Sequence, residues 1–172
     1  RLPSSTTYTF PKPSTVIPWG EANCPSPEPL LPHLFINPPF ESNEFVHHGK
    51  KYERVAIIIY ERRNNVKLLD FGLLKHPSIG FLGASPDSIC NILTLTGALA
   101  IIGGRMVEIK CVYSRKLKHT GDINGDRCLH YYWIQVQLQL ECCELEECDF
   151  WQCKIEEYKN RDGFVSDCHP KD

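Results

Sequence analysis

The sequence has 172 residues, a formal net charge of −2 and a hydrophobic fraction of 42%. This length and composition are typical of one soluble domain with a single apolar core. The apolar runs are too short to span a bilayer, which excludes a membrane-spanning protein. A chain so close to neutrality does not bind nucleic acid by bulk charge, so any such binding requires a local basic surface and bound cations. The N-terminus lacks the apolar stretch of a signal peptide, and we therefore expect an intracellular protein.

Nine cysteines allow three interpretations: buried thiols, a metal or iron–sulfur site, and disulfides. The spacing of Cys142, Cys143, Cys148 and Cys153 contains no C-x-x-C pair, the arrangement that zinc sites favour. Several cysteines occupy apolar positions of expected helices and strands, where a free thiol behaves as a small hydrophobic group. We favour structural thiols in a reducing compartment over the other two interpretations.

Residues 1–43 contain ten of the thirteen prolines and show little periodicity. Proline lacks a backbone N–H, so this segment is not expected to form a helix or a central strand. We interpret it as a proline-rich arm or wrapping loop. The folded domain is expected to comprise residues 44–172.

Periodicity and turn residues predict an α-β-β-β-α-β order within this domain. The expected elements are a helix over 45–62, strands over 66–75, 79–93 (with a bend at 85–86) and 98–112, a basic loop over 114–127, a helix over 130–143 and an alternating strand over 148–158. The double glycine Gly103-Gly104 is expected to be the turn of a hairpin. Gln135 and Gln139 lie near one edge of the second helix. This order predicts an α/β fold with a small mixed sheet flanked by helices.

The residues that carry chemistry form a short pattern on the expected strands. Asp87 follows a Ser-Pro bend, and Glu108 and Lys110 are two positions apart, so their side chains share one face of a strand. Two carboxylates and the main-chain carbonyl of Ile109 provide the oxygen ligands that Mg²⁺ prefers. A lysine beside them can orient an attacking water and offset charge on a phosphate. The pattern therefore suits metal-dependent hydrolysis of a phosphodiester.

The same pattern has a simpler interpretation, because a Glu-x-Lys pair on a strand is usually a solvated surface with a cross-strand ion pair. Longer sequence blocks favour the catalytic interpretation. They are GKKYE at 49–53, GASPD at 83–87, VEIKC at 107–111 and YYWIQVQLQ at 131–139. In this order they resemble the motifs of the YqaJ-like, phage lambda-type exonuclease family, within the PD-(D/E)xK nuclease superfamily. The resemblance covers roughly residues 45–158, and its last part, through ECDFW at 147–151, is most similar to versions from large cytoplasmic DNA viruses.

The resemblance implies a role for each matching residue. Asp87, Glu108 and the carbonyl of Ile109 would hold Mg²⁺ or Mn²⁺, and Lys110 would be the catalytic lysine. Further positions would contribute to a second metal site or a water contact (Glu53), reach the site from a helix (Gln135) and contact the DNA backbone (Ser114 and Arg115).

The resemblance also implies an activity: 5′-to-3′ exonuclease digestion of double-stranded DNA in viral recombination, repair or replication. It further implies a trimeric ring, a single-strand-annealing partner protein and, for a viral protein, the host cytoplasm. Two departures leave alternatives open. The family's N-terminal block that grips a 5′ phosphate has no counterpart here, and Ser88 replaces the usual glycine after Ser-Pro-Asp. An endonuclease that cuts internally is therefore the main alternative. A non-enzymatic binding module and an iron–sulfur nuclease are the others.

Overall fold

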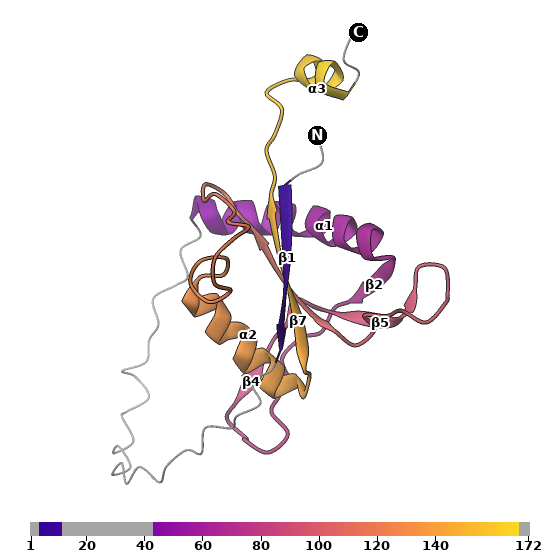
Figure 1. The fold of residues 1–172 in the computed structure, drawn as a ribbon, viewed down its shortest axis with the longest axis vertical. Coiled ribbons are helices and arrows are strands. Elements are labelled where there is room, and N and C mark those ends of the chain that lie inside the picture. The colour runs from indigo at the N-terminus through magenta and orange to yellow at the C-terminus, as the bar shows by residue number, and fades with distance from the viewer. Residues whose placement is uncertain (1–3, 12–42, 169–172) are drawn as a thin grey trace.

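The computed structural model describes residues 4–11 and 43–168, which fold around one five-stranded mixed sheet (Figure 1). In spatial order the strands are β1 (Ser4–Pro11), β7 (Glu147–Lys154), β6 (Met106–Cys111), β5 (Ser88–Thr94) and β2 (Val66–Leu69). The β6–β7 pair is parallel and the other pairs are antiparallel. A separate two-stranded sheet joins β3 (Leu74–Lys75) to β4 (Gly83–Ala84). The helices are α1 (Glu44–Asn64), α2 (His130–Cys143) and α3 (Arg161–Cys168).

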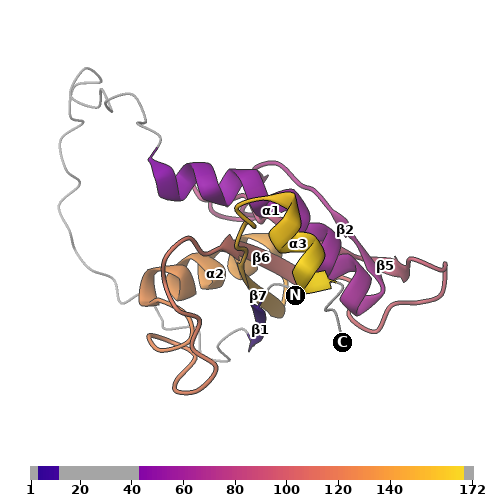
Figure 2. The same cartoon turned by 90° about the horizontal axis from the view of Figure 1, so that it is seen from above.

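The two long helices lie on opposite faces of the sheet (Figure 2). Successive strand residues point to opposite faces, so β6 and β7 contribute to two separate cores. Beneath α1, Val107 and Ile109 of β6 pack with Trp151 of β7. On the α2 side, Met106 and Phe150 pack with residues of that helix. A mixed sheet between two helices is the predicted α/β architecture, and the prediction is confirmed.

Helix α1 begins and ends close to the predicted positions. The side chain of Asn43 caps its first turn by accepting a hydrogen bond from Val46 N at 3.0 Å. Asn65 adopts a left-handed conformation at its C-terminus, with φ of 50°. The buried carboxylate of Glu61 then accepts from Leu68 N at 3.0 Å, which joins the end of α1 to β2.

The predicted hairpin at Gly103-Gly104 is wrong. The antiparallel partner of β6 is β5, and the chain reverses at Thr94–Gly97, where Thr94 N donates to Ala98 O at 2.7 Å. The double glycine does lie in a local turn, where Gly103 N donates to Ala100 O at 3.1 Å, but this turn is on the returning segment against β5 and joins no hairpin. A Cβ at Gly103 would come within 2.9 Å of Ile92 Cα, so close backbone approach explains the glycine there.

The N-terminal segment and the last strand also differ from the predictions. Residues 4–11, expected as an arm, form an edge strand that pairs antiparallel with β7 along its whole length. An edge position tolerates the proline at its end. Residues 12–42 lie outside the described residues, so the division of the chain at residue 43 stays a prediction. Strand β7 ends at Lys154, short of the predicted 158, and it is buried on both faces instead of alternating.

Helix α3 lies beyond the end of β7, away from the sheet (Figure 1), and adds an element to the predicted order.

Five of the cysteines in the described ranges are buried: Cys90, Cys128, Cys142, Cys148 and Cys153. Within those same ranges, no helix has the length and apolar character needed to cross a bilayer.

Candidate active site

Strand β6 carries the centre of the site. Glu108 and Lys110 lie on its α2-facing side, whereas Ile109 between them packs in the core beneath α1, as predicted. Glu108 is fully buried, with 0% of its surface exposed. The interpretation of Glu-x-Lys as a solvated surface pair is therefore wrong. An ionised carboxylate at such a depth is costly unless charges and hydrogen bonds compensate for its lost hydration.

Three side chains donate hydrogen bonds to the Glu108 carboxylate. Lys110 Nζ and Gln135 Nε2 both donate to Oε1, the latter at 2.7 Å. Gln139 Nε2 donates to Oε2 at 2.9 Å. Both glutamines project from α2, one helical turn apart, and so face the same strand. The helix thereby fixes the direction in which Glu108 points.

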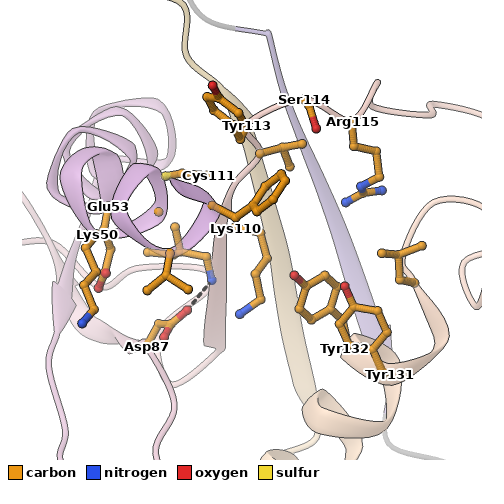
Figure 3. A pocket seen from close by; sticks show the side chains of 16 residues that line it. Lys50, Glu53, Asp87, Lys110, Cys111, Tyr113, Ser114, Arg115, Tyr131 and Tyr132 are labelled. Atoms are coloured by element: carbon orange, nitrogen blue, oxygen red, sulfur yellow. Dashed lines mark hydrogen bonds between the residues drawn. The ribbon is translucent and has the colours of Figure 1, made fainter. Parts of the chain in front are cut away.

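Asp87 reaches the same point from the bend that precedes β5. Its Oδ2 accepts a hydrogen bond from Ile109 N at 2.7 Å (Figure 3). Gln139 Nε2 also donates to Ser85 O at 3.2 Å, which ties the Ser-Pro-Asp bend to the amide that holds Glu108. Helix α2, through Gln139, and strand β6, through Ile109 N, thus hold the carboxylates of Glu108 and Asp87 near each other.

Burial and neighbouring charges shift the pKa values of Asp87 and Lys110. Burial, and after it the negative charge of Glu108, raises the pKa of Asp87 to about 6. Burial by itself would lower the pKa of Lys110. The negative charges of Glu108 and Asp87 outweigh this effect, so the pKa is raised overall. The ammonium group of Lys110 also lies 4.9 Å from the centre of the Tyr132 ring, a cation–π contact.

A cavity of about 490 Å³ opens onto Lys110 and Asp87 between the first turns of α1 and the start of α2. Glu53 of α1 is exposed to solvent and lines this cavity on the same side as Asp87 (Figure 3). Basic side chains are present at its wall as well, namely Lys50, Lys110 and Arg115. The cavity therefore presents carboxylates, which can hold a metal ion, together with basic groups, which can hold an anion bound to that metal.

The predicted DNA contacts, Ser114 and Arg115, lie on the wall of this cavity. Arg115 Nη2 donates to Gln152 Oε1 at 2.5 Å. The structure thus brings Glu53, Asp87, Ile109, Lys110, Ser114 and Arg115 together at one cavity. Glu108 and Gln135 lie directly behind Lys110.

The predictions missed three residues that contact this group. Gln139 could have been found, because it is four residues from Gln135 and therefore on the same helix face. The contact of Tyr132 with Lys110 and the contact of Gln152 with Arg115 depend on how α2 and β7 lie against β6. Nothing in the local sequence specifies either.

The donor set fits a hydrated divalent cation. Mg²⁺ commonly uses only one or two protein carboxylates and keeps several waters. In the described part of the chain, no group of three or more His, Cys, Asp or Glu side chains is close enough to enclose a metal ion. Asp87, Glu108 and a main-chain carbonyl match the sparser arrangement, and a cation would relieve the repulsion that raises the pKa of Asp87.

Comparison with known proteins identifies the family. Residues 23–146 match the YqaJ-like viral recombinase domain. Uncharacterized protein R354 of Acanthamoeba polyphaga mimivirus is 49% identical over 132 residues, which is 77% of this chain and 24% of that protein. The chain therefore spans about a quarter of this relative.

Two solved structures are also similar. The alkaline exonuclease LHK-Exo from Laribacter hongkongensis has a TM-score of 0.46 and 25% identity, over 65% of this chain and 51% of that one. The complex of LHK-Exo with dAMP has a TM-score of 0.47 and 22% identity, over 74% of this chain and 64% of that one. On the evidence of the sequence match over residues 23–146, the chain belongs to the YqaJ-like viral recombinase family, as its motifs predicted.

Proposed function

We propose that this chain is a divalent-metal-dependent DNA nuclease whose active site is formed by Asp87, Glu108 and Lys110. The observation that carries the proposal is the fully buried Glu108, which three donors hold directly behind Lys110, at a cavity that Lys110 and Asp87 line. Buried carboxylates that repel one another reduce stability, and such arrangements are concentrated at functional sites. Membership of the YqaJ-like viral recombinase family supports the same conclusion.

In this proposal Asp87, Glu108 and the Ile109 carbonyl hold Mg²⁺ or Mn²⁺. When bound, the ion acidifies a coordinated water and withdraws charge from the phosphate. Glu53 faces the cavity on the Asp87 side and would contact the outer hydration or a second ion. Gln135 and Gln139 keep Glu108 in one orientation.

Lys110 has a more restricted role than its position alone suggests. Because its pKa is raised, Lys110 retains its proton at neutral pH in the metal-free site. An ammonium group donates hydrogen bonds and accepts none. Lys110 would therefore orient the attacking water and offset the phosphate charge, and it would not act as the base.

Ser114 and Arg115 would contact the DNA backbone next to the scissile phosphate, since both line the same cavity wall. Their contribution would be local, consistent with a net charge of −2. By family resemblance we propose 5′-to-3′ digestion of double-stranded DNA ends in viral recombination, repair or replication. The same resemblance extends the proposal to a homo-oligomer, a single-strand-annealing partner and a cytoplasmic site of action.

The test compares linear duplex DNA with the same DNA as a covalently closed circle, each with Mg²⁺, Mn²⁺ or a chelator. An exonuclease degrades the linear form, leaves the circle intact and stops when the metal is chelated. Degradation of the circle at the same rate as the linear form would contradict the exonuclease and support the alternative, an endonuclease that cuts internally. Undiminished cleavage in the chelator would contradict metal dependence.

A further inference from the structure

We propose that Gln152 is a positioning residue that holds Arg115, with its charge unpaired, against a DNA backbone phosphate beside the catalytic cavity. This inference rests on the nuclease function proposed above. It assigns a role to a buried side chain on β7 that the resemblance to known nucleases did not mark.

The register of the sheet places Gln152 next to the site. Gln152 is the partner of Lys110 in the parallel β6–β7 pair, so the two side chains lie on the same, α2-facing side. Gln152 is fully buried, with 0% exposure. A buried primary amide must find partners for both its carbonyl and its NH₂ group.

Gln152 finds those partners at the two ends of one loop. Its Oε1 accepts from Arg115 Nη2 at 2.5 Å, and its Nε2 donates to the main-chain oxygen of Arg127 at 3.0 Å. Arg115 lies near the start and Arg127 near the end of the long basic connection between β6 and α2. One side chain of the sheet thus anchors both ends of this loop beside Lys110.

The chemistry of the amide matters as much as its position. Its oxygen is a neutral acceptor, so it fixes the guanidinium group without neutralising it. Within residues 4–11 and 43–168, Arg115 forms no ion pair with a carboxylate. Among residues 43–168 the guanidinium, which lines the cavity, therefore has no acidic partner that would neutralise its charge. A planar donor of this kind matches the oxygens of a phosphate.

The test is a double-mutant cycle between Gln152→Met and Arg115→Ala, measured by DNA cleavage and by binding of a short fluorescent DNA duplex. In the wild-type background, we expect Gln152→Met to raise KM about tenfold and to leave kcat within about twofold, because a charge-assisted contact is misplaced. In the Arg115→Ala background, the same substitution should have little further effect. A similar rise in KM in both backgrounds would mean that Gln152 acts independently of Arg115, and it would overturn the proposal.

The salt dependence of duplex binding gives a readout that general destabilisation does not mimic. Loss of one phosphate contact should reduce the slope of log K against log salt by about 0.9. Gln152→Met and Arg115→Ala should both show this reduction, whereas Arg62→Ala, an exposed cation at the far end of α1, should keep the wild-type slope. A wild-type slope in Arg115→Ala would contradict the phosphate contact.

A second variant covers the case in which Gln152→Met does not fold. Gln152→Glu keeps the size and the acceptor for Arg115, loses the donor to the Arg127 carbonyl, and forms an ion pair that cancels the charge of Arg115. Circular dichroism verifies that this variant is folded. We expect the reduced salt slope and the raised KM in this variant as well, and unchanged values would overturn the proposal.

Hydrogen exchange separates this inference from the nuclease proposal. If Gln152 anchors the loop, exchange in Gln152→Met should be faster at both ends of residues 114–127. A wild-type protein that neither cuts nor binds DNA would refute the nuclease function and, with it, the role of Arg115. An active wild-type protein with no coupling between the two residues and no change in exchange would refute the role of Gln152 alone.

Discussion

At the scale of single residues, Glu108 shows how this site departs from a stable core. Its carboxylate is completely buried on β6, close to the ionisable Asp87. A protein with a well-packed apolar side chain at such a position is often at least as stable as one with the buried charge. The charge is kept in place by Lys110, Gln135 and Gln139, which occupy both of its oxygens.

Asp87→Asn should abolish cleavage but stabilise the metal-free protein near pH 7. The pKa of Asp87 is raised from 3.8 to about 6, so its ionised form is disfavoured in the folded state. The free energy of unfolding therefore falls as the pH rises from about 4, where Asp87 ionises in the unfolded chain, to about 6, where it ionises in the folded protein. The total loss is at most about 3 kcal/mol. Urea unfolding in a chelator checks this: the advantage of the variant should be present at pH 7 and vanish below about pH 4. A less stable variant at pH 7 would contradict the electrostatic argument.

The same raised pKa predicts how metal binding depends on pH. Below about pH 6, Asp87 takes up a proton and loses its ligand charge, so the apparent affinity for Mg²⁺ should fall about tenfold per pH unit. Cleavage rates measured at several Mg²⁺ concentrations check this, and added Mg²⁺ should restore the rate at pH 5.5. Loss of activity that no concentration of Mg²⁺ reverses would point to a different titrating group.

Gln139→Leu tests the amide that joins Glu108 to the Ser-Pro-Asp bend. Its loss leaves a buried carboxylate oxygen and the Ser85 carbonyl without their donor, at a cost of about 1–3 kcal/mol. Misorientation of Glu108 should also reduce kcat by roughly ten- to a hundredfold.

Gln137→Leu is the matched control for this change on the same helix. The polar side-chain atoms of Gln137 are buried and have no hydrogen-bond partner in the described part of the chain. Its replacement should therefore be neutral or stabilising and should leave kcat unchanged. Equal effects of the two substitutions on kcat would show that Gln139 does not orient Glu108.

At the scale of the elements, the sequence predicted those whose own periodicity specifies them. Helix α2 has the predicted bounds, and α1 lies close to them. The hairpin was misplaced because glycine serves equally in a local turn pressed against a strand and in the turn of a hairpin. The pairing of β1 with β7 joins segments more than 130 residues apart, and no local pattern specifies such a contact.

Tyr60 provides a test of packing that is separate from catalysis. Its hydroxyl, buried beneath α1, donates to Asp149 Oδ2 of β7 at 2.6 Å. Tyr60→Phe should cost about 1–3 kcal/mol in the free energy of unfolding, because it removes a donor to a buried carboxylate. Its kcat should match the wild type. A large fall in kcat with unchanged stability would mean that this contact reaches the active site.

At the scale of the whole molecule, the fold brings together residues that are far apart in sequence. The placement of Asp87, Glu108 and Lys110 near one another was predictable, because the fixed geometry of a strand and a Ser-Pro bend limits where they point. Gln152 and Tyr132 were not, because their roles depend on the packing of β7 and α2 against β6. The charge of the cavity is local, which reconciles a net charge of −2 with the proposed binding of DNA.

The most direct test of the central claim is cleavage of linear duplex DNA by the wild-type protein and by Glu108→Gln, with Mg²⁺ present. The substitution preserves the size of the side chain, removes its charge and replaces one of its two acceptor oxygens with an NH₂ donor, and circular dichroism would verify that the variant is folded. We predict that the wild-type protein degrades the DNA and that the variant loses at least about a hundredfold in rate. Equal rates for the two proteins would show that the site around Glu108 does not hydrolyse DNA.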